Sequence, residues 1–218
     1  MQLPEPRAVL WDMDGTMIHS GEYHWLAWRD VMEQEGRPIT REVFSATFGQ
    51  RNDTILRRYF GDDFPLHEMQ RIADDKEARY RELVYTRGIE LLPGVQHWLD
   101  YLKAHGWRQA VASAAPRKNI ETILEVLAIG PYFDAIVSAE DVQHGKPDPQ
   151  VFLKAAERLG VPPPHCIVIE DAPAGIEGAS RADMHTIGVR TTHEGLQADW
   201  SVSSLDELPD NAFERLLL

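Results

Sequence analysis

The chain has 218 residues, and 22 Lys plus Arg against 35 Asp plus Glu give it a formal net charge of −13. This length allows one large domain or a domain with an insertion, and 43% hydrophobic residues suffice for a sizeable core. We expect neither nucleic acid nor a membrane as partner, because the charge is acidic and no apolar stretch reaches the length of a membrane-spanning helix.

Five short apolar runs predict the strands of a parallel sheet that is covered on both faces. Segments with helical periodicity lie between several of them, and the alternation is typical of a doubly wound, Rossmann-like α/β fold. One predicted helix has Asp148 as its N-cap and Pro149 as its first residue, and Gly160 follows its end. The runs cover residues 8–11, 110–112, 135–137, 166–169 and 186–189.

A long interval after the first strand contains helical patterns and no convincing strand. We expect an inserted all-helical domain whose first helix spans roughly residues 24–34 and whose last spans roughly 67–86, with loops at Gly36–Pro38 and Gly61–Pro65. The predicted division gives residues 1–16 and 88–218 to the α/β core, and residues 17–87 to the helical cap domain.

The first strand ends in Asp12-Met-Asp14-Gly-Thr16. Residues two apart on an extended segment face the same side, so Asp12 and Asp14 are expected to project together. Ligands bind at the carboxyl ends of parallel strands, and two carboxylates placed together there repel unless a cation separates them. Mg²⁺ prefers such hard oxygen ligands, so the pattern favours a magnesium site.

Polar residues also follow three later strands. Ser113 follows the second run, Lys146 lies in the proline-rich loop after the third, and Glu170 and Asp171 end the fourth. Each residue has an ordinary alternative, because acidic residues and serines at strand ends often cap the next helix and most lysines are merely solvated. Together they favour a site for a metal ion and a phosphate.

These residues, in this order, resemble the four motifs of the haloacid dehalogenase superfamily of phosphotransferases, and the resemblance extends over essentially the whole chain. It implies that Asp12 is the nucleophile that forms an aspartyl-phosphate and that Asp14 is the general acid and base. It adds Ser113 and Lys146 to the catalytic set. It also implies Mg²⁺ held by Asp12, the backbone carbonyl of Asp14 and Asp171, with Glu170 in support.

The inserted helices resemble the small cap of the subclass that includes β-phosphoglucomutase and phosphoglycolate-type phosphatases. Such a cap excludes water and carries specificity contacts. His24 and Lys76 lie on the apolar stripes of the first and last cap helices, where a hydrogen-bonded histidine and a snorkelling lysine are the ordinary alternatives. The substrate-binding residues predicted in all are Thr16, His24, Gly49, Arg51, Lys76, Ala114, Lys118 and Asn119.

We therefore expect an Mg²⁺-dependent phosphatase that acts on a small phosphorylated metabolite, with a sugar phosphate as the first candidate. The alternatives are a hexose-phosphate mutase of the β-phosphoglucomutase type, phosphonate cleavage through an imine at Lys76, and a catalytically silent binding or regulatory module. Dehalogenation is disfavoured because Asp14 and the acidic pair suit a metal-bound phosphoryl group. A single cysteine, Cys166, and the lack of a signal-peptide pattern indicate a cytoplasmic protein, which we expect to be a monomer.

Overall fold

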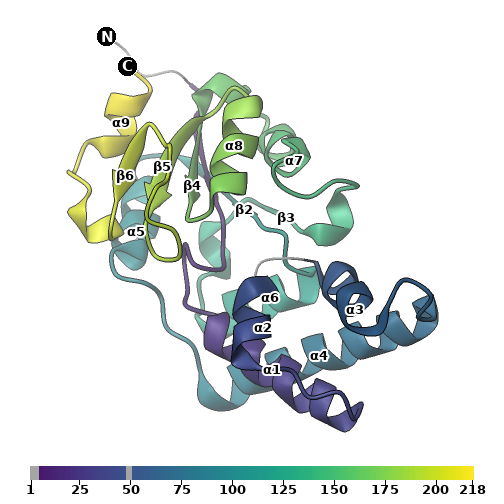
Figure 1. The fold of residues 1–218 in the computed structure, drawn as a ribbon. Helices are drawn as coiled ribbons and strands as arrows, with labels where there is room; N and C mark the ends of the chain where they lie inside the picture. The colour runs from purple at the N-terminus through teal and green to yellow at the C-terminus, as the bar shows by residue number, and fades with distance from the viewer. Residues whose placement is uncertain (1–4, 48–50) are drawn as a thin grey trace. The chain divides into compact units, whose positions relative to one another are not determined.

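The computed structural model describes residues 5–47 and 51–218. Over these residues, six strands form one parallel sheet in the order β3-β2-β1-β4-β5-β6 (Figure 1). The order runs outwards from β1 in both directions, which confirms the doubly wound α/β prediction. The strands are β1 (Ala8–Trp11), β2 (Arg108–Ala112), β3 (Ala135–Val137), β4 (Cys166–Glu170), β5 (His185–Val189) and β6 (Trp200–Val202).

One face of the sheet packs against α7 (Gln150–Leu159) and α8 (Pro173–Arg181), and α8 lies beside β4 in Figure 1. Alternate residues of the central strands supply this face, because successive side chains of a strand point to opposite sides. Leu10 is one of them, and it is paired in register with Ala110 and Val168.

The opposite face packs against α5 (Val95–Ala104). Gln109 on this face donates a hydrogen bond of 3.2 Å to the carbonyl of Leu99 in α5, and accepts one of 3.0 Å from the indole of Trp11. The ring of Trp98 in α5 lies 4.9 Å from the ring of Phe213 in α9 (Ala212–Leu216), and the two rings are tilted by 56°. Coverage on both faces explains why the strand sequences are apolar without alternation.

Helix α7 begins and ends close to the predicted signals. The carboxylate of Asp148 accepts a hydrogen bond of 3.0 Å from the backbone N–H of Gln150, so it satisfies one donor at the start of the helix. Gly160 follows the last turn with φ +63° and ψ +38°, a left-handed conformation that glycine adopts without steric cost. Helix α6 (Arg117–Val126) follows β2 in the chain.

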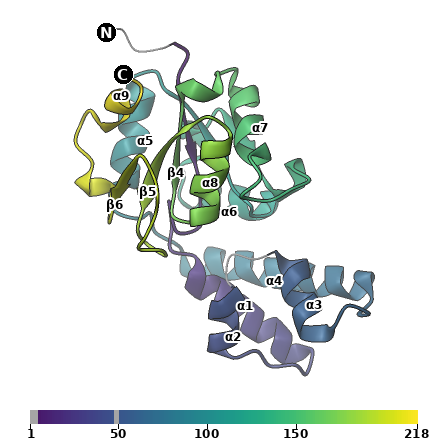
Figure 2. The same cartoon turned by 45° about the horizontal axis from the view of Figure 1, so that its top comes forward.

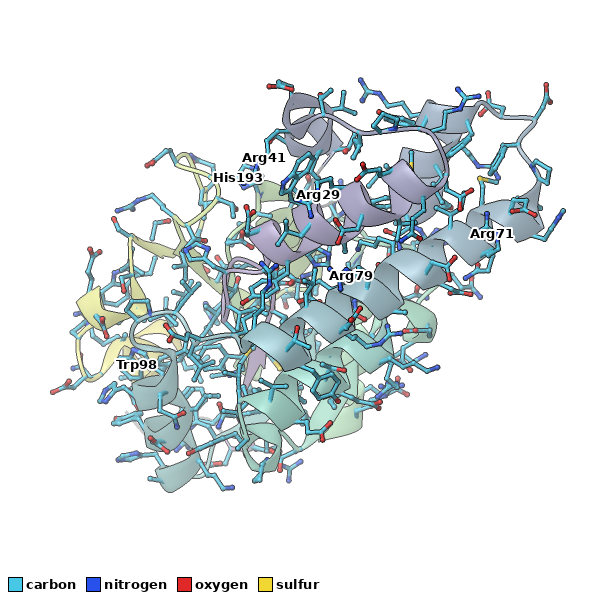
Figure 3. All side chains as sticks on the ribbon, turned by 90° about the horizontal axis from the view of Figure 1, so that it is seen from below. Arg29, Arg41, Arg71, Arg79, Trp98 and His193 are labelled. Atoms are coloured by element: carbon cyan, nitrogen blue, oxygen red, sulfur yellow. The ribbon has the colours of Figure 1, made fainter. Side chains whose placement is uncertain are left out.

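The chain divides into two compact units: Met1–His19 with Ile89–Leu218, called the core unit here, and Ser20–Gly88, called the helical unit. Within the helical unit, α1 and α4 pack side by side (Figure 2). Figure 3 shows Arg71 and Arg79 along α4, where they pair with Glu35 at 2.9 Å and Asp30 at 2.8 Å. The helices are α1 (Gly21–Gln34), α2 (Arg41–Thr47), α3 (Asn52–Phe60) and α4 (Leu66–Arg87).

The helical unit has an apolar core of its own, formed by residues of all four helices and the loop before α2. Its buried members are Trp28, Val31, Met32, Ile39, Phe44, Ile55, Leu56, Met69 and Ile72. Among the described residues, no helix has both the length and the apolar character that crossing a membrane requires.

Candidate active site

Asp12 continues the sheet one residue beyond β1. Its backbone N–H donates a hydrogen bond of 3.0 Å to the carbonyl of Ile169 in β4, so the parallel pairing extends to the carboxyl end of both strands. Only 7% of Asp12 is exposed. Because Glu170 and Asp171 follow Ile169 directly, the sheet itself brings the three carboxylates to one place.

The three carboxylates form a compact buried group. Asp12, Glu170 and Asp171 each offer an oxygen, and these oxygens lie within 4.8 Å of one another. Lys146 reaches this group from the loop between β3 and α7, with its ammonium 2.6 Å from Asp12 Oδ1 and 2.6 Å from Glu170 Oε1. One ammonium does not balance three carboxylates, so a divalent cation fits the group in charge as well as in ligand chemistry.

Burial dominates the electrostatics of this group. It raises the pKa of Asp12 well above its usual value, and the charges of Glu170 and Asp171 add to this effect while Lys146 opposes it. Burial and the charge of Glu170 likewise raise the pKa of Asp171 to about 6. Burial would lower the pKa of Lys146, but its two carboxylate partners outweigh burial and raise it. Lys146 is therefore a permanent cation, while Asp12 and Asp171 hold protons more readily than in water.

The Glu170 side chain is held in its orientation by backbone N–H groups that immediately precede α8. Its Oε2 accepts hydrogen bonds of 2.8 Å from the backbone N–H groups of Asp171 and Ala172, which leaves Oε1 for Lys146. A Cβ at Gly175 would overlap the Glu170 side chain, so this helix position has to be glycine for the carboxylate to lie where it does.

The turn after β1 lies against Asp171. Gly15 has φ +92°, and a Cβ there would overlap the Asp171 carboxylate, so glycine is needed for conformation and for space. Thr16 is buried and donates a long hydrogen bond of 3.4 Å to Asp171 Oδ1. The half-buried carboxylate of Asp14 is not part of the metal-binding group, although its charge contributes to the raised pKa of Asp171. Its predicted contribution to the metal is its backbone carbonyl.

The residues predicted after β2 lie at the carboxyl end of that strand. Ser113 is buried, its N–H donates to the carbonyl of Val137 at 3.1 Å, and its hydroxyl accepts from the N–H of Ala115 at 3.1 Å. Ala114 and Lys118 are exposed, whereas Asn119 in the first turn of α6 is buried. In this conformation the hydroxyl of Ser113 is therefore hydrogen-bonded within the loop that follows β2.

Sequence reasoning did not single out the loop after β5. Thr191 donates to the carbonyl of Gly15, Thr192 Oγ1 contacts Asp171 Oδ2, and His193 Nδ1 lies 3.3 Å from the carbonyl of Asp171. A signal was present, because polar residues follow the fifth apolar run just as they follow the others. The end of β5 is therefore the fifth strand end of the core unit that is followed by polar residues.

In the helical unit, His24 and Lys76 lie together. The Lys76 ammonium is 2.9 Å from His24 Nδ1 and lies over the rings of Trp28 and Tyr80, and the His24 ring stacks on Tyr80 at 4.1 Å. Lys76 is only 2% exposed. The structure therefore brings two predicted cap residues into one buried polar cluster.

Arg51 and Gly49 are the other residues predicted in this unit. Arg51 is exposed and pairs with Asp53 at 3.3 Å. Gly49 lies outside the described residues.

Glu77 completes the cluster around Lys76, and sequence reasoning missed it. Its Oε1 lies 2.8 Å from the Lys76 ammonium and accepts a hydrogen bond of 2.7 Å from Asn52. Burial acts to raise the pKa of Glu77, but the charges of Lys76 and His24 and the hydrogen bonds outweigh burial and lower it. Glu77 is therefore a buried anion that balances a buried cation.

Comparison with known proteins identifies one family. The model of the haloacid dehalogenase-like hydrolases matches residues 6–183. The β-phosphoglucomutase of Bacillus subtilis is 35% identical over 208 residues, covering 93% of this chain and 91% of that protein. The fructose-1-phosphate phosphatase YqaB of Escherichia coli is 33% identical over 184 residues, covering 84% and 95%. The crystal structure of CbbY from Rhodobacter sphaeroides in complex with phosphate has a TM-score of 0.85 at 27% identity, covering 92% and 95%.

Proposed function

The chain belongs to the family of haloacid dehalogenase-like hydrolases, and we propose that it is an Mg²⁺-dependent phosphatase that hydrolyses a small sugar phosphate through an aspartyl-phosphate. The observation that supports this most directly is the Lys146 ammonium between Asp12 and Glu170, within a buried group of three carboxylates. Such a group has little use in a stable core, because burying unbalanced charge is costly.

In the proposed reaction, Asp12 attacks the phosphorus, the bond to the sugar oxygen breaks, and Asp14 donates a proton to that oxygen. Asp14 then takes a proton from water, which attacks the aspartyl-phosphate and releases phosphate and free Asp12. Splitting the transfer into two steps lowers each barrier. Lys146 reduces the repulsion between the Asp12 carboxylate and the phosphoryl oxygens. Asp12, the Asp14 carbonyl and Asp171, supported by Glu170, would hold Mg²⁺, which when bound neutralises charge on a phosphoryl oxygen.

We further propose that residues 17–87 act as the cap domain and supply contacts to the sugar. The proposed substrate contacts within the described residues are Thr16, Ala114, Lys118 and Asn119 of the core unit, and His24, Arg51 and Lys76 of the helical unit, with Ser113 in the catalytic set.

A hexose-phosphate mutase is the second candidate, and the 35% identity to a β-phosphoglucomutase supports it. The two reactions share the attack of Asp12 and differ in the fate of the aspartyl-phosphate. A phosphatase passes the phosphoryl group to water, whereas a mutase keeps it until a sugar hydroxyl takes it back.

The test is to incubate the protein with Mg²⁺ and a panel of sugar phosphates, including fructose 1-phosphate and β-glucose 1-phosphate with its bisphosphate. Free phosphate and isomerised sugar are both measured, beside the variant Asp12→Asn. We expect phosphate release that the substitution abolishes. Isomerised sugar with little free phosphate would establish the mutase instead, and no Asp12-dependent product in either assay would contradict both.

A further inference from the structure

The loop after β5 is hydrogen-bonded to the turn after β1 and to the segment after β4, which carry the buried carboxylates. Thr191 donates a hydrogen bond to the carbonyl of Gly15, in the turn after Asp12. The next residue, Thr192, contacts Asp171. His193, which is labelled in Figure 3, follows it. Two adjacent hydroxyls therefore connect β5 to the turn after β1 and to the end of β4.

The contacts of Thr192 determine what its hydroxyl does. Oγ1 contacts Asp171 Oδ2, lies 3.2 Å from the Asp171 carbonyl oxygen, and is 2.9 Å from His193 Nδ1. A hydroxyl has one proton to donate, and the carboxylate oxygen is the closest of these atoms and a charged acceptor. Thr192 therefore donates to Oδ2, and its lone pairs remain available to His193.

The two oxygens of Asp171 consequently differ. Oδ2 is engaged by Thr192 and is the atom nearest to the position that a Cβ at Gly15 would occupy. Oδ1 has the long 3.4 Å contact with Thr16. Asp171 can thus bind a cation through Oδ1 and keep the Thr192 hydrogen bond, whereas binding through both oxygens would require that bond to break.

We propose that Thr192 is a positioning residue that makes Asp171 a single-oxygen metal ligand and thereby favours Mg²⁺ over Ca²⁺. Mg²⁺ needs six oxygens in a compact octahedron, which single-oxygen carboxylates supply, whereas Ca²⁺ accepts six to eight and often takes both oxygens of a carboxylate. The inference rests on the proposed function, in which Asp171 binds the metal.

The test measures metal binding without turnover. Thermal unfolding of the full chain is followed against MgCl₂ and, separately, CaCl₂ at constant ionic strength, and the dependence of Tm on metal concentration gives each Kd. We expect Thr192→Val to raise the Kd for Mg²⁺ about tenfold, as loss of a hydrogen bond to a metal ligand commonly does. The Kd for Ca²⁺ should stay unchanged or fall, so the preference for Mg²⁺ drops about tenfold.

Three further variants make the result specific. Thr192→Ser keeps the hydroxyl and should retain the preference for Mg²⁺. Thr192→Ala removes the hydroxyl with a side chain smaller than valine, and it should give the same Kd values as Thr192→Val. Thr54→Val makes the same substitution at an exposed position of α3 and should change neither Kd.

Equal changes in both Kd values, or no change in either, would overturn the inference. Phosphate release from the unsubstituted protein is assayed in parallel. If the unsubstituted protein releases phosphate and Thr192→Val keeps the same preference for Mg²⁺, only the proposed role of Thr192 is refuted and the phosphatase stands. Metal binding without Asp12-dependent release would refute the phosphatase, and the titrations would still decide the role of Thr192. A protein whose Tm responds to neither metal would overturn both.

Discussion

At the scale of single residues, the buried acidic group is only partly balanced by the protein itself. Lys146 contacts Asp12 and Glu170 at 2.6 Å each, and the pKa of Asp171 is nevertheless raised to about 6. Burial is the largest cause and the charge of Glu170 the next. Protons and a metal cation therefore compete for the oxygens of these carboxylates.

This competition predicts that Mg²⁺ stabilises the protein more at pH 7 than at pH 5. The pKa of Asp171 is about 6 in the folded protein against an ordinary 3.8, so the folded state favours the protonated form. That contribution to stability is fully present below about pH 3.8 and is lost as the pH rises through about 6, by up to roughly 3 kcal/mol without metal. Mg²⁺ needs the ionised form, so its gain in Tm should increase over the same range.

The measurement compares Tm in EDTA and in excess MgCl₂ at half-unit steps from pH 5 to pH 8. Asp12 contributes in the same direction, because its pKa is also raised. Asp171→Asn serves as the control and should flatten the metal-free profile. An equal gain in Tm from Mg²⁺ at pH 5 and pH 7 would contradict the raised pKa.

Residues at strand ends were predictable where the sequence pattern was strong. Apolar runs followed by carboxylates located Asp12, Glu170 and Asp171, and the parallel sheet brings them together. Lys146 could be assigned to the site only from its place in the order of the four motifs, because its local sequence does not show that a loop lysine points inwards. The polar residues after the fifth apolar run indicated a strand end but not the role of Thr192, which depends on its contacts with Asp171 and His193 in the fold. The role of Glu77 likewise depends on its contacts with Lys76 and Asn52.

At the scale of elements, the sequence predicted the strands that form continuous apolar runs and the helices that are long enough to show a period. The apolar run 8–11 coincides with β1, and the predicted helices 24–34 and 67–86 lie within α1 and α4. Strand β6 was missed because its sequence, Trp-Ser-Val, has a polar residue at its centre and forms no apolar run, whereas the equally short edge strand β3 reads Ala-Ile-Val and was predicted. Helices α2 and α3 were not resolved individually, since they have seven and nine residues and few buried positions to set a period.

The charge pair on α4 provides a prediction for the helical unit. Glu77→Gln leaves the Lys76 ammonium buried without its nearest carboxylate, 2.8 Å away. Breaking a buried ion pair from one side commonly costs about 3 kcal/mol or more, so the free energy of unfolding should fall by roughly that amount. Urea denaturation followed by circular dichroism measures the change.

Glu82→Gln is the matched control, because it removes the same charge from the same helix at a side chain that is 61% exposed. An exposed pair contributes at most about 1 kcal/mol, so this variant should remain close to the unsubstituted protein. The double variant Glu77→Gln with Lys76→Met should recover part of the loss, since it removes the unbalanced charge. Equal effects of Glu77→Gln and Glu82→Gln would show that burial of the pair has no energetic weight.

At the scale of the whole molecule, the apolar core of the helical unit shares no residue with the apolar cluster on the α7 and α8 face of the sheet, over the residues that the structure describes. Leu56 is fully buried in the core of the helical unit, and Leu10 is fully buried in the sheet of the core unit. The helical unit is one continuous stretch, Ser20–Gly88, inserted into the core unit. A unit with an apolar core of its own is expected to open as a separate cooperative unit.

Native-state hydrogen exchange on the full chain tests whether the two units open separately. Leu56→Ala should destabilise the helical unit by about 3 kcal/mol and accelerate exchange in α1 and α4 roughly a hundredfold, because each 1.4 kcal/mol is a factor of ten. Amides of β1 and β4 should keep their rates. Leu10→Ala, the same substitution in the core unit, should accelerate β1 and β4 in turn. If Leu56→Ala accelerated β4 as much as α4, the chain would unfold as one cooperative body, and an independently opening cap would have to be abandoned.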